Sequence, residues 1–155
     1  MTNYAEWIDH GLAKKSVHRS RNLHYPPDSY FTGFWFGEST TELSPDLLQF
    51  IQAGEPPLLI TFGSMPFDVS FDIQKAIIKL SKELGIRILI VKGWGFENTE
   101  WLESHSSIKV IASAPFDKLL PLVKAAVHHG GIGTAAECLR AGIPFLPCPV
   151  IYPMG

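Results

Sequence analysis

Short apolar runs that alternate with segments of helical periodicity constrain the fold of this chain more than any other feature. The apolar runs cover residues 57–62, 87–91, 108–111, 125–128 and 144–147. The helical segments cover residues 46–52, 72–84, 117–123 and 134–141. Continuous apolar strands that alternate with amphipathic helices predict an α/β fold, with a Rossmann-like parallel sheet and helices on both faces.

Capping residues in the sequence predict several helix boundaries. Ser44-Pro45-Asp46 is typical of an N-cap followed by a first-turn proline and an acid near the helix dipole. Gly85 ends the longest helical segment. The periodicity of that segment predicts one buried face made of Ile73, Ala76, Ile77, Leu80 and Leu84.

Composition excludes several classes of protein. The chain has 155 residues, 46% of them hydrophobic, and a formal net charge of −2, which gives no electrostatic case for nucleic-acid binding. It has no signal-peptide core and no apolar run of about 20 residues that would span a membrane. Cys138 and Cys148 lie in apolar surroundings and are expected to be buried thiols, so a reducing, cytoplasmic location fits best. No metal-ligand spacing is present, and no metal is expected.

The segment from residue 125 to residue 137 carries the strongest chemical signal. An apolar strand ends in His128-His129, a turn with Gly130, Gly131 and Gly133 follows, and a helix-forming segment continues from Thr134. Backbone N–H groups at a helix N-terminus bind phosphate or diphosphate. Side chains alternate along a strand, so one histidine is expected to face inward and the other, His129, to face a ligand.

Further small-residue loops follow the other strands. They are Gly63-Ser64, Gly93-Trp94-Gly95 and Ser113-Ala114-Pro115. Ligands of parallel sheets lie beyond the carboxyl ends of the strands, so these loops together predict a nucleotide cleft. Gly63-Ser64 is either a simple turn or a phosphate contact, and Trp94 is either an exposed loop residue or a wall of the base pocket. Glu137 either favours the helix dipole or accepts hydrogen bonds from a ribose diol.

The glycine turn also fits a second interpretation. Gly131, Gly133 and Ala136 match the dinucleotide fingerprint G-x-G-x-x-G/A. That reading expects an acidic residue about 20 positions later, and no Asp or Glu follows Glu137. NAD binding is therefore the weaker alternative.

Four segments occur in a characteristic order: Thr61–Met65, Gly93-Trp94-Gly95, residues 114–121 and residues 125–137. Together they resemble the C-terminal, donor-binding half of family 1 GT-B glycosyltransferases. The likeness is strongest to sterol 3-beta-glucosyltransferases and antibiotic glycosyltransferases. It implies a hexosyltransferase that uses a UDP-sugar, with UDP-glucose expected, for inverting transfer to a lipid, sterol-like or other small-molecule hydroxyl. It further implies residues 1–36 as the remnant of an N-terminal domain and linker, and residues 37–155 as a donor-binding domain truncated at its C-terminus.

The resemblance also assigns roles to individual residues. His129, Gly130, Gly131, Gly133 and Thr134 would hold the diphosphate. Glu137 would hold the ribose, Gly63 and Ser64 would close over the phosphates, Trp94 would border the base pocket, and the loop Ser113, Ala114 and Pro115 would meet the base. Plant members carry a stacking tryptophan where this chain has Ser113, which leaves the base preference open.

The same resemblance implies missing parts. The Asp-Gln pair that grips the sugar in the family would follow Gly155, and the acceptor domain with its general-base histidine is almost wholly absent. We therefore expect no catalytic residue in this chain and no cofactor beyond the UDP-sugar substrate. The alternative is a nucleotide-sugar-binding subunit or remnant that needs a separate acceptor-domain partner, and the intact enzyme is expected to associate peripherally with membranes.

Overall fold

The computed structural model describes residues 33–63, 71–93 and 99–149. The chain divides into two compact units, residues 1–37 and 38–155. In the described part of the first unit, the rings of Phe34 and Phe36 lie 6.1 Å apart. The predicted division after residue 36 stays a prediction, and the helix expected near residues 4–15 lies outside the described residues.

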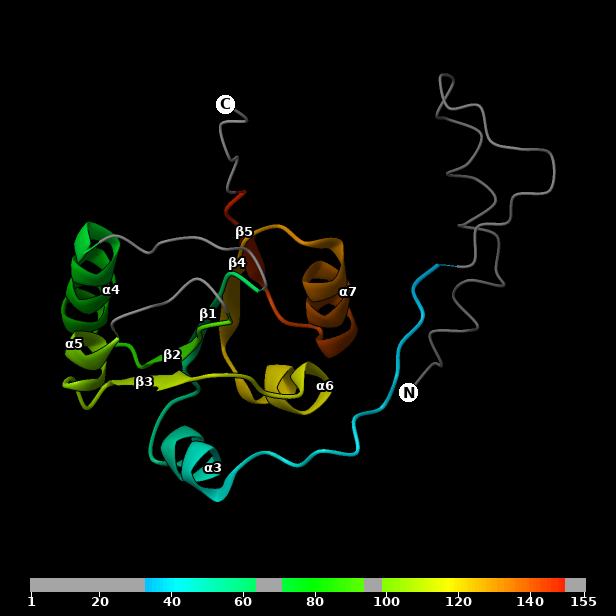
Figure 1. Cartoon of the computed structure of the whole chain (residues 1–155), viewed down its shortest axis with the longest axis horizontal. Helices are drawn as coiled ribbons and strands as arrows, with labels where there is room; N and C mark the ends of the chain where they lie inside the picture. The colour runs from blue at the N-terminus through cyan, green and yellow to red at the C-terminus, as the bar shows by residue number, and fades with distance from the viewer. Residues whose placement is uncertain (1–32, 64–70, 94–98, 150–155) are drawn as a thin grey trace. The chain divides into compact units, whose positions relative to one another are not determined.

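The second unit is built on a parallel sheet of five strands (Figure 1). The strands are β1 (Leu58–Thr61), β2 (Ile88–Val91), β3 (Ile108–Ile111), β4 (Ala125–His128) and β5 (Phe145–Pro147). Their order across the sheet is β3-β2-β1-β4-β5, and every neighbouring pair is parallel. Thr61 at the end of β1 is in register with Val91 of β2 and His128 of β4. The predicted parallel sheet is confirmed.

One helix precedes the first strand, and the others connect successive strands. The helices are α3 (Pro45–Gln52), α4 (Phe71–Leu84), α5 (Glu100–Glu103), α6 (Phe116–Leu119) with the 3₁₀ turn η1 (Leu120–Leu122), and α7 (Ile132–Ala141). One helix was predicted over residues 117–123, but the structure has a short α-helix followed by a 3₁₀ turn. Pro121 lies in that turn, where it cannot continue the α-helical hydrogen bonds. The sequence analysis missed α5, since four residues are too few to show a helical period.

Two apolar clusters make the core, one on each face of the sheet. Buried side chains of α3, including Leu47, pack with Leu59, Leu89, Ala126 and Cys138. On the other face, Ile77 and Ile78 of α4 pack with strand residues such as Ile60 and Ile90. Because neighbouring residues of a strand point to opposite faces, β1, β2, β3 and β4 each contribute to both clusters. Helices on both faces were predicted and are confirmed.

The cysteines lie in these two clusters. Cys138 is fully buried in the first cluster, and the half-buried Cys148 packs against the second. Both are free thiols, and the predicted burial is confirmed for Cys138 but not for Cys148, which is only partly buried. Burial raises the pKa of the Cys138 thiol, with a smaller contribution from the Glu137 carboxylate.

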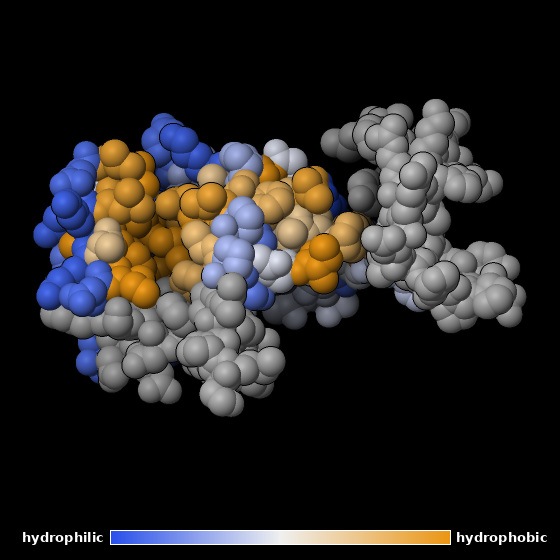
Figure 2. Space-filling view, turned by 90° about the horizontal axis from the view of Figure 1, so that it is seen from above, coloured by the Kyte–Doolittle hydropathy of each residue, from blue (hydrophilic) through white to orange (hydrophobic). Residues whose placement is uncertain are grey.

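The buried face of α4 differs from the one that periodicity predicted. Gln74, Ile77, Ile78 and Ser81 are buried, whereas Leu84 is 63% exposed. Ala76 and Leu80 also lie on the exposed side. Figure 2 shows the molecule from above, turned by 90° from the view of Figure 1. At the end of the molecule where α4 lies, hydrophobic surface borders a hydrophilic edge. The prediction failed because Ser81 belongs to the buried stripe for a polar reason: its hydroxyl donates to the Ile86 carbonyl at 2.7 Å.

Local capping fixes α3 at both ends. The Ser44 side chain accepts a hydrogen bond from the Leu47 N–H at 3.3 Å, so the predicted N-cap is confirmed. At the other end, the Arg87 guanidinium donates to the carbonyls of Ile51 and Glu55, each at 3.1 Å, and to that of Phe50. The guanidinium carbon also lies 4.2 Å from the centre of the Phe50 ring. Arg87, immediately before β2, thereby ties α3 to the sheet.

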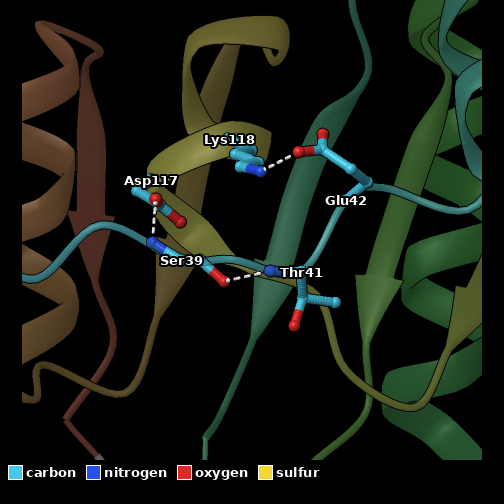
Figure 3. A network of polar contacts seen from close by, with 5 residues as sticks. All are labelled: Ser39, Thr41, Glu42, Asp117 and Lys118. Atoms are coloured by element: carbon cyan, nitrogen blue, oxygen red, sulfur yellow. Dashed lines mark hydrogen bonds and ion pairs between the residues drawn. The ribbon is translucent and has the colours of Figure 1, made fainter.

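Residues 39–44 run beside α6 and are held there by polar contacts (Figure 3). The Ser39 N–H donates to the Asp117 carboxylate at 2.8 Å, and Lys118 forms an ion pair with Glu42. The Thr41 N–H donates to the Ser39 hydroxyl at 3.3 Å. This segment therefore has a fixed position next to the loop that follows β3.

Candidate functional site

The loops singled out in the sequence follow strands at the carboxyl edge of the sheet. Gly63 follows β1, Ser113 follows β3, and His129 follows β4. Ser64 and Trp94 lie outside the described residues, so their predicted roles stay predictions. The described loop residues form three groups, which differ in how closely they come together.

The first group brings Gly63, His129 and Gly131 into direct contact. A Cβ atom added to Gly63 would lie 2.9 Å from His129 Cε1, and one added to Gly131 would overlap the same ring at Nε2. A Cβ on Gly93 would overlap the Gly63 carbonyl oxygen. Gly63 and Gly93 also have positive φ angles of 63° and 54°, which favour glycine. The glycines leave just enough space for the His129 ring between two loops.

The two histidines face different surroundings, as side-chain alternation predicted. His128 is fully buried, whereas His129 is half-buried at the edge of the sheet. Their rings meet edge to face, with centroids 6.2 Å apart. Burial lowers the pKa of His128 below its ordinary value, and the nearby His129 lowers it further. The ligand-contact role of His129 stays a prediction.

The N-terminus of α7 follows directly after His129. The helix begins at Ile132, two residues before the predicted start, with Gly131 as the N-cap residue. Its first intrahelical hydrogen bond runs from the Ala135 N–H to the Gly131 carbonyl at 3.0 Å. The N–H groups of Ile132, Gly133 and Thr134 precede that bond and have no acceptor within the helix. They form, together with the His129 ring, a set of hydrogen-bond donors suited to an anion.

Glu137 forms a second group one turn further along α7. Its carboxylate lies 3.9 Å from Nη1 of Arg140, and its side chain is largely shielded from solvent. It borders a cavity of about 70 Å³ together with Phe116 and Asp117 of α6. The Glu137 carboxylate therefore lies between α6 and α7, where it can accept hydrogen bonds from a small polar group.

The third group surrounds the loop after β3. Ser113, Ala114 and Pro115 border a cavity of about 320 Å³, and residues 39–44 form its other wall. Sequence reasoning missed that wall, because these residues precede the sheet and carry no motif beyond the Ser44 cap. It also missed Thr61, which accepts a hydrogen bond at the end of β1.

Metal-binding clusters and membrane-spanning helices are both absent from the described ranges. Residues 33–63, 71–93 and 99–149 contain no group of three His, Cys, Asp or Glu side chains placed to hold a metal ion. Within the same ranges, none of the helices has both the length and the apolar character needed to cross a membrane.

Comparison with known proteins identifies relatives of the chain. No protein-family profile matches it. It is 36% identical over 99 residues to a sterol 3-beta-glucosyltransferase of Arabidopsis thaliana, a match that covers 64% of this chain and 16% of that protein. It is 34% identical over 128 residues to the O-mycaminosyltylonolide 6-deoxyallosyltransferase of Streptomyces fradiae, covering 81% of this chain and 29% of that protein. The chain is homologous to one part of the glycosyltransferases.

The chain thus spans less than a third of the length of these two relatives. Solved structures agree on the fold. The glycotransferase of kitacinnamycin superposes with a TM-score of 0.60 at 18% identity, covering 79% of this chain and 31% of that one. Os79 from O. sativa, solved in complex with UDP, superposes with a TM-score of 0.52 at 14% identity, covering 75% and 28%. The fold is the Rossmann-like half of a GT-B glycosyltransferase.

Proposed function

We propose that this chain binds the nucleoside diphosphate of a sugar donor and forms the donor-binding half of a hexosyltransferase. The donor is a UDP-sugar, with UDP-glucose as the preferred one. The observation that carries the proposal is the His129 imidazole, held between Gly63 and Gly131 beside the N-terminus of α7. The sterol glucosyltransferase relative and the UDP complex of a protein with the same fold support the choice of donor.

The diphosphate is the chemical centre of this proposal. In an inverting transfer, an acceptor hydroxyl oxygen bonds to the anomeric carbon while the bond from that carbon to the diphosphate oxygen breaks. A base takes the hydroxyl proton, and the diphosphate leaves with the additional negative charge. His129 and the free N–H groups of α7 stabilise that charge, because they are oriented before the reaction and do not need to reorganise.

The remaining groups at the edge of the sheet hold the nucleoside. Glu137 accepts hydrogen bonds from the ribose hydroxyls in the space between α6 and α7. The loop of Ser113, Ala114 and Pro115 contacts the base. Ser113 offers a hydroxyl rather than a flat ring, so we infer that base recognition relies on hydrogen bonds more than on stacking.

We propose that the acceptor-binding site lies outside this donor-binding domain. The base and the acceptor site, which takes a lipid, a sterol-like molecule or another small-molecule hydroxyl, belong to a further domain or to a separate subunit. The intact enzyme acts in the cytoplasm, where the free Cys138 and Cys148 stay reduced, and it associates peripherally with the membrane that holds a lipid acceptor.

Calorimetric titration of the 155-residue chain with UDP tests this function. We expect UDP to bind and NAD not to bind. His129→Ala should weaken UDP binding roughly 10-fold to 100-fold, the effect of losing a hydrogen bond to a charged group. His105→Ala is the matched control. His105 precedes β3 and therefore lies toward the amino ends of the strands, whereas His129 lies at their carboxyl ends.

The titration distinguishes a UDP site from a dinucleotide site. Circular dichroism first establishes that both variants are folded. Binding of NAD in place of UDP would return the glycine turn to the dinucleotide class. Absence of UDP binding in the folded chain, or equal affinity in the His129→Ala variant, would contradict the proposal.

A further inference from the structure

Two buried polar side chains lie next to each other at the ends of neighbouring strands. Thr61 ends β1 and is 1% exposed, and His128 ends β4 and is fully buried. The two residues are register partners. Their neighbours two positions earlier, Leu59 and Ala126, belong to the core cluster that includes the α3 residues. Because side chains alternate along a strand, Thr61 and His128 lie on this same face.

Each of these side chains accepts a hydrogen bond from a glycine two residues further on. The Gly63 N–H donates to Thr61 Oγ1 at 3.4 Å, and the Gly130 N–H donates to His128 Nδ1 at 3.1 Å. Both glycines have positive φ angles, 63° and 91°. The strand β1 and the strand β4 therefore end in the same way, with a buried acceptor that fixes the start of a left-handed turn.

The two turns meet at the His129 ring. Gly63 belongs to the first turn, and the space above its Cα is limited by His129 Cε1. Gly131, directly after the second turn, limits the same ring at Nε2. An added Cβ on either glycine would reach the ring, so both turns lie close against the imidazole. The position of the imidazole thus depends on both turns at once.

The hydrogen bond from Gly130 also fixes the protonation of His128. Nδ1 accepts, so the neutral ring carries its proton on Nε2. Nε2 is buried and has no hydrogen-bond partner among the described residues. The bond from Gly130 to Nδ1 is therefore the polar contact that orients this buried ring within the described residues. Phe145, 5.2 Å away between ring centroids, supplies only an apolar neighbour.

We propose that Thr61 and His128 are positioning residues for the donor site: they fix the two glycine turns and so hold the His129 imidazole where it meets the diphosphate. This inference rests on the proposed function for its last step. The turn geometry itself does not depend on any ligand. The two parts can therefore be tested separately.

The test uses paired variants of the 155-residue chain. Thr61→Val and His128→Leu remove the acceptors while keeping similar volumes. Thr61→Ser and His128→Asn restore an acceptor oxygen at a comparable position. Ser81→Ala is the control, because Ser81 is a buried polar residue of α4 whose hydroxyl bonds to the Ile86 carbonyl and to Ser107. Ring-proton NMR signals of His129 and amide signals of Gly63 and Gly130 report the positions of the two turns.

Thr61→Val and His128→Leu should shift the His129 ring signals and weaken UDP binding by about 10-fold, the effect of a displaced hydrogen-bonding group. The Ser and Asn variants should restore both readouts to within about threefold of the unaltered chain. Ser81→Ala should lower stability and leave both readouts unchanged. Rescue by the conservative variants separates positioning from a general loss of packing.

Several outcomes would overturn the inference. It fails if the His129 signals stay unchanged in Thr61→Val and His128→Leu, or if Ser81→Ala shifts them equally. It also fails if the Asn and Ser variants remain as defective as their partners. If His128→Leu does not fold, the Thr61→Val and Thr61→Ser pair decides the question. Shifted ring signals in a chain that does not bind UDP would uphold the positioning role and reject the proposed function.

Discussion

At the scale of single residues, the glycines near His129 serve different physical purposes. Gly63 needs both its left-handed backbone and the absence of a side chain. Gly131 has an ordinary φ of −58°, so its backbone would accept other residues, yet a side chain there would overlap the His129 ring. Sequence inspection places Gly131 in the phosphate-binding turn after β4 and Gly63 in a separate loop after β1. The structure assigns Gly131 a steric role that a turn pattern does not express.

Gly131→Ala should therefore displace the imidazole without straining the backbone. We expect UDP affinity to fall by at least about 10-fold, and stability to fall by about 1–3 kcal/mol because of overpacking. Calorimetry and urea unfolding measure the two effects. Gly37→Ala is the matched control, because a Cβ there would meet no atom within 4 Å. Unchanged UDP binding in Gly131→Ala would show that the ring position does not matter.

At the scale of elements, periodicity located the long helices and strands but could not assign the buried face of α4. Gln74 and Ser81 are buried while Leu84 is exposed, because a helix stripe is chosen by its neighbours as well as by its hydrophobicity. Helix ends were more predictable. Ser44 caps α3 through its own side chain, and Gly85, with a φ of 61°, follows the end of α4. The cation at the C-terminal end of α3 comes from Arg87, far along the chain, and no local pattern indicates it.

Arg87→Leu should uncouple α3 from the sheet. Loss of hydrogen bonds from a charged group to the α3 carbonyls should lower the free energy of unfolding by about 1.5–3 kcal/mol. Arg87→Lys keeps the charge but lacks the planar fork, so its loss should be smaller. Urea unfolding at pH 7 compares the three proteins. Equal stability of Arg87→Leu and the unaltered chain would show that these contacts contribute nothing.

At the scale of the whole second unit, β1 is the central strand, with two strands on one side and two on the other. Its residues bridge distant parts of the sequence: Leu59 pairs with Leu89 of β2 and with Ala126 of β4. Since both apolar clusters include β1 residues, this strand connects the two halves of the core.

Leu59→Ala and Leu84→Ala test this arrangement with the same chemical change. Leu59 is fully buried, so its truncation should cost about 2–5 kcal/mol of unfolding free energy. Leu84 is 63% exposed, and its truncation should change stability by no more than about 0.5 kcal/mol. Urea unfolding measures both changes in unfolding free energy, provided that the dependence on urea concentration is the same in both variants. Similar losses in the two variants would place Leu84 in a buried environment and contradict the fold.

Features that depend on neighbouring residues could be predicted from the amino-acid sequence. The strands Ile108–Ile111 and Ala125–His128, the Ser44 cap, the parallel class of the sheet and the opposite orientations of His128 and His129 all follow from local periodicity and composition. The roles of Ser64 and Trp94 remain predictions from the same kind of reasoning. Such features are local because backbone geometry repeats every two or 3.6 residues.

Contacts between distant parts of the chain became visible only in the folded structure. It placed Thr61 next to His128, enclosed the His129 ring between Gly63 and Gly131, and brought Arg87 to the end of α3. These contacts join residues separated by tens of positions along the chain. Their formation depends on strand order and on the packing of whole faces, and no local period carries that information.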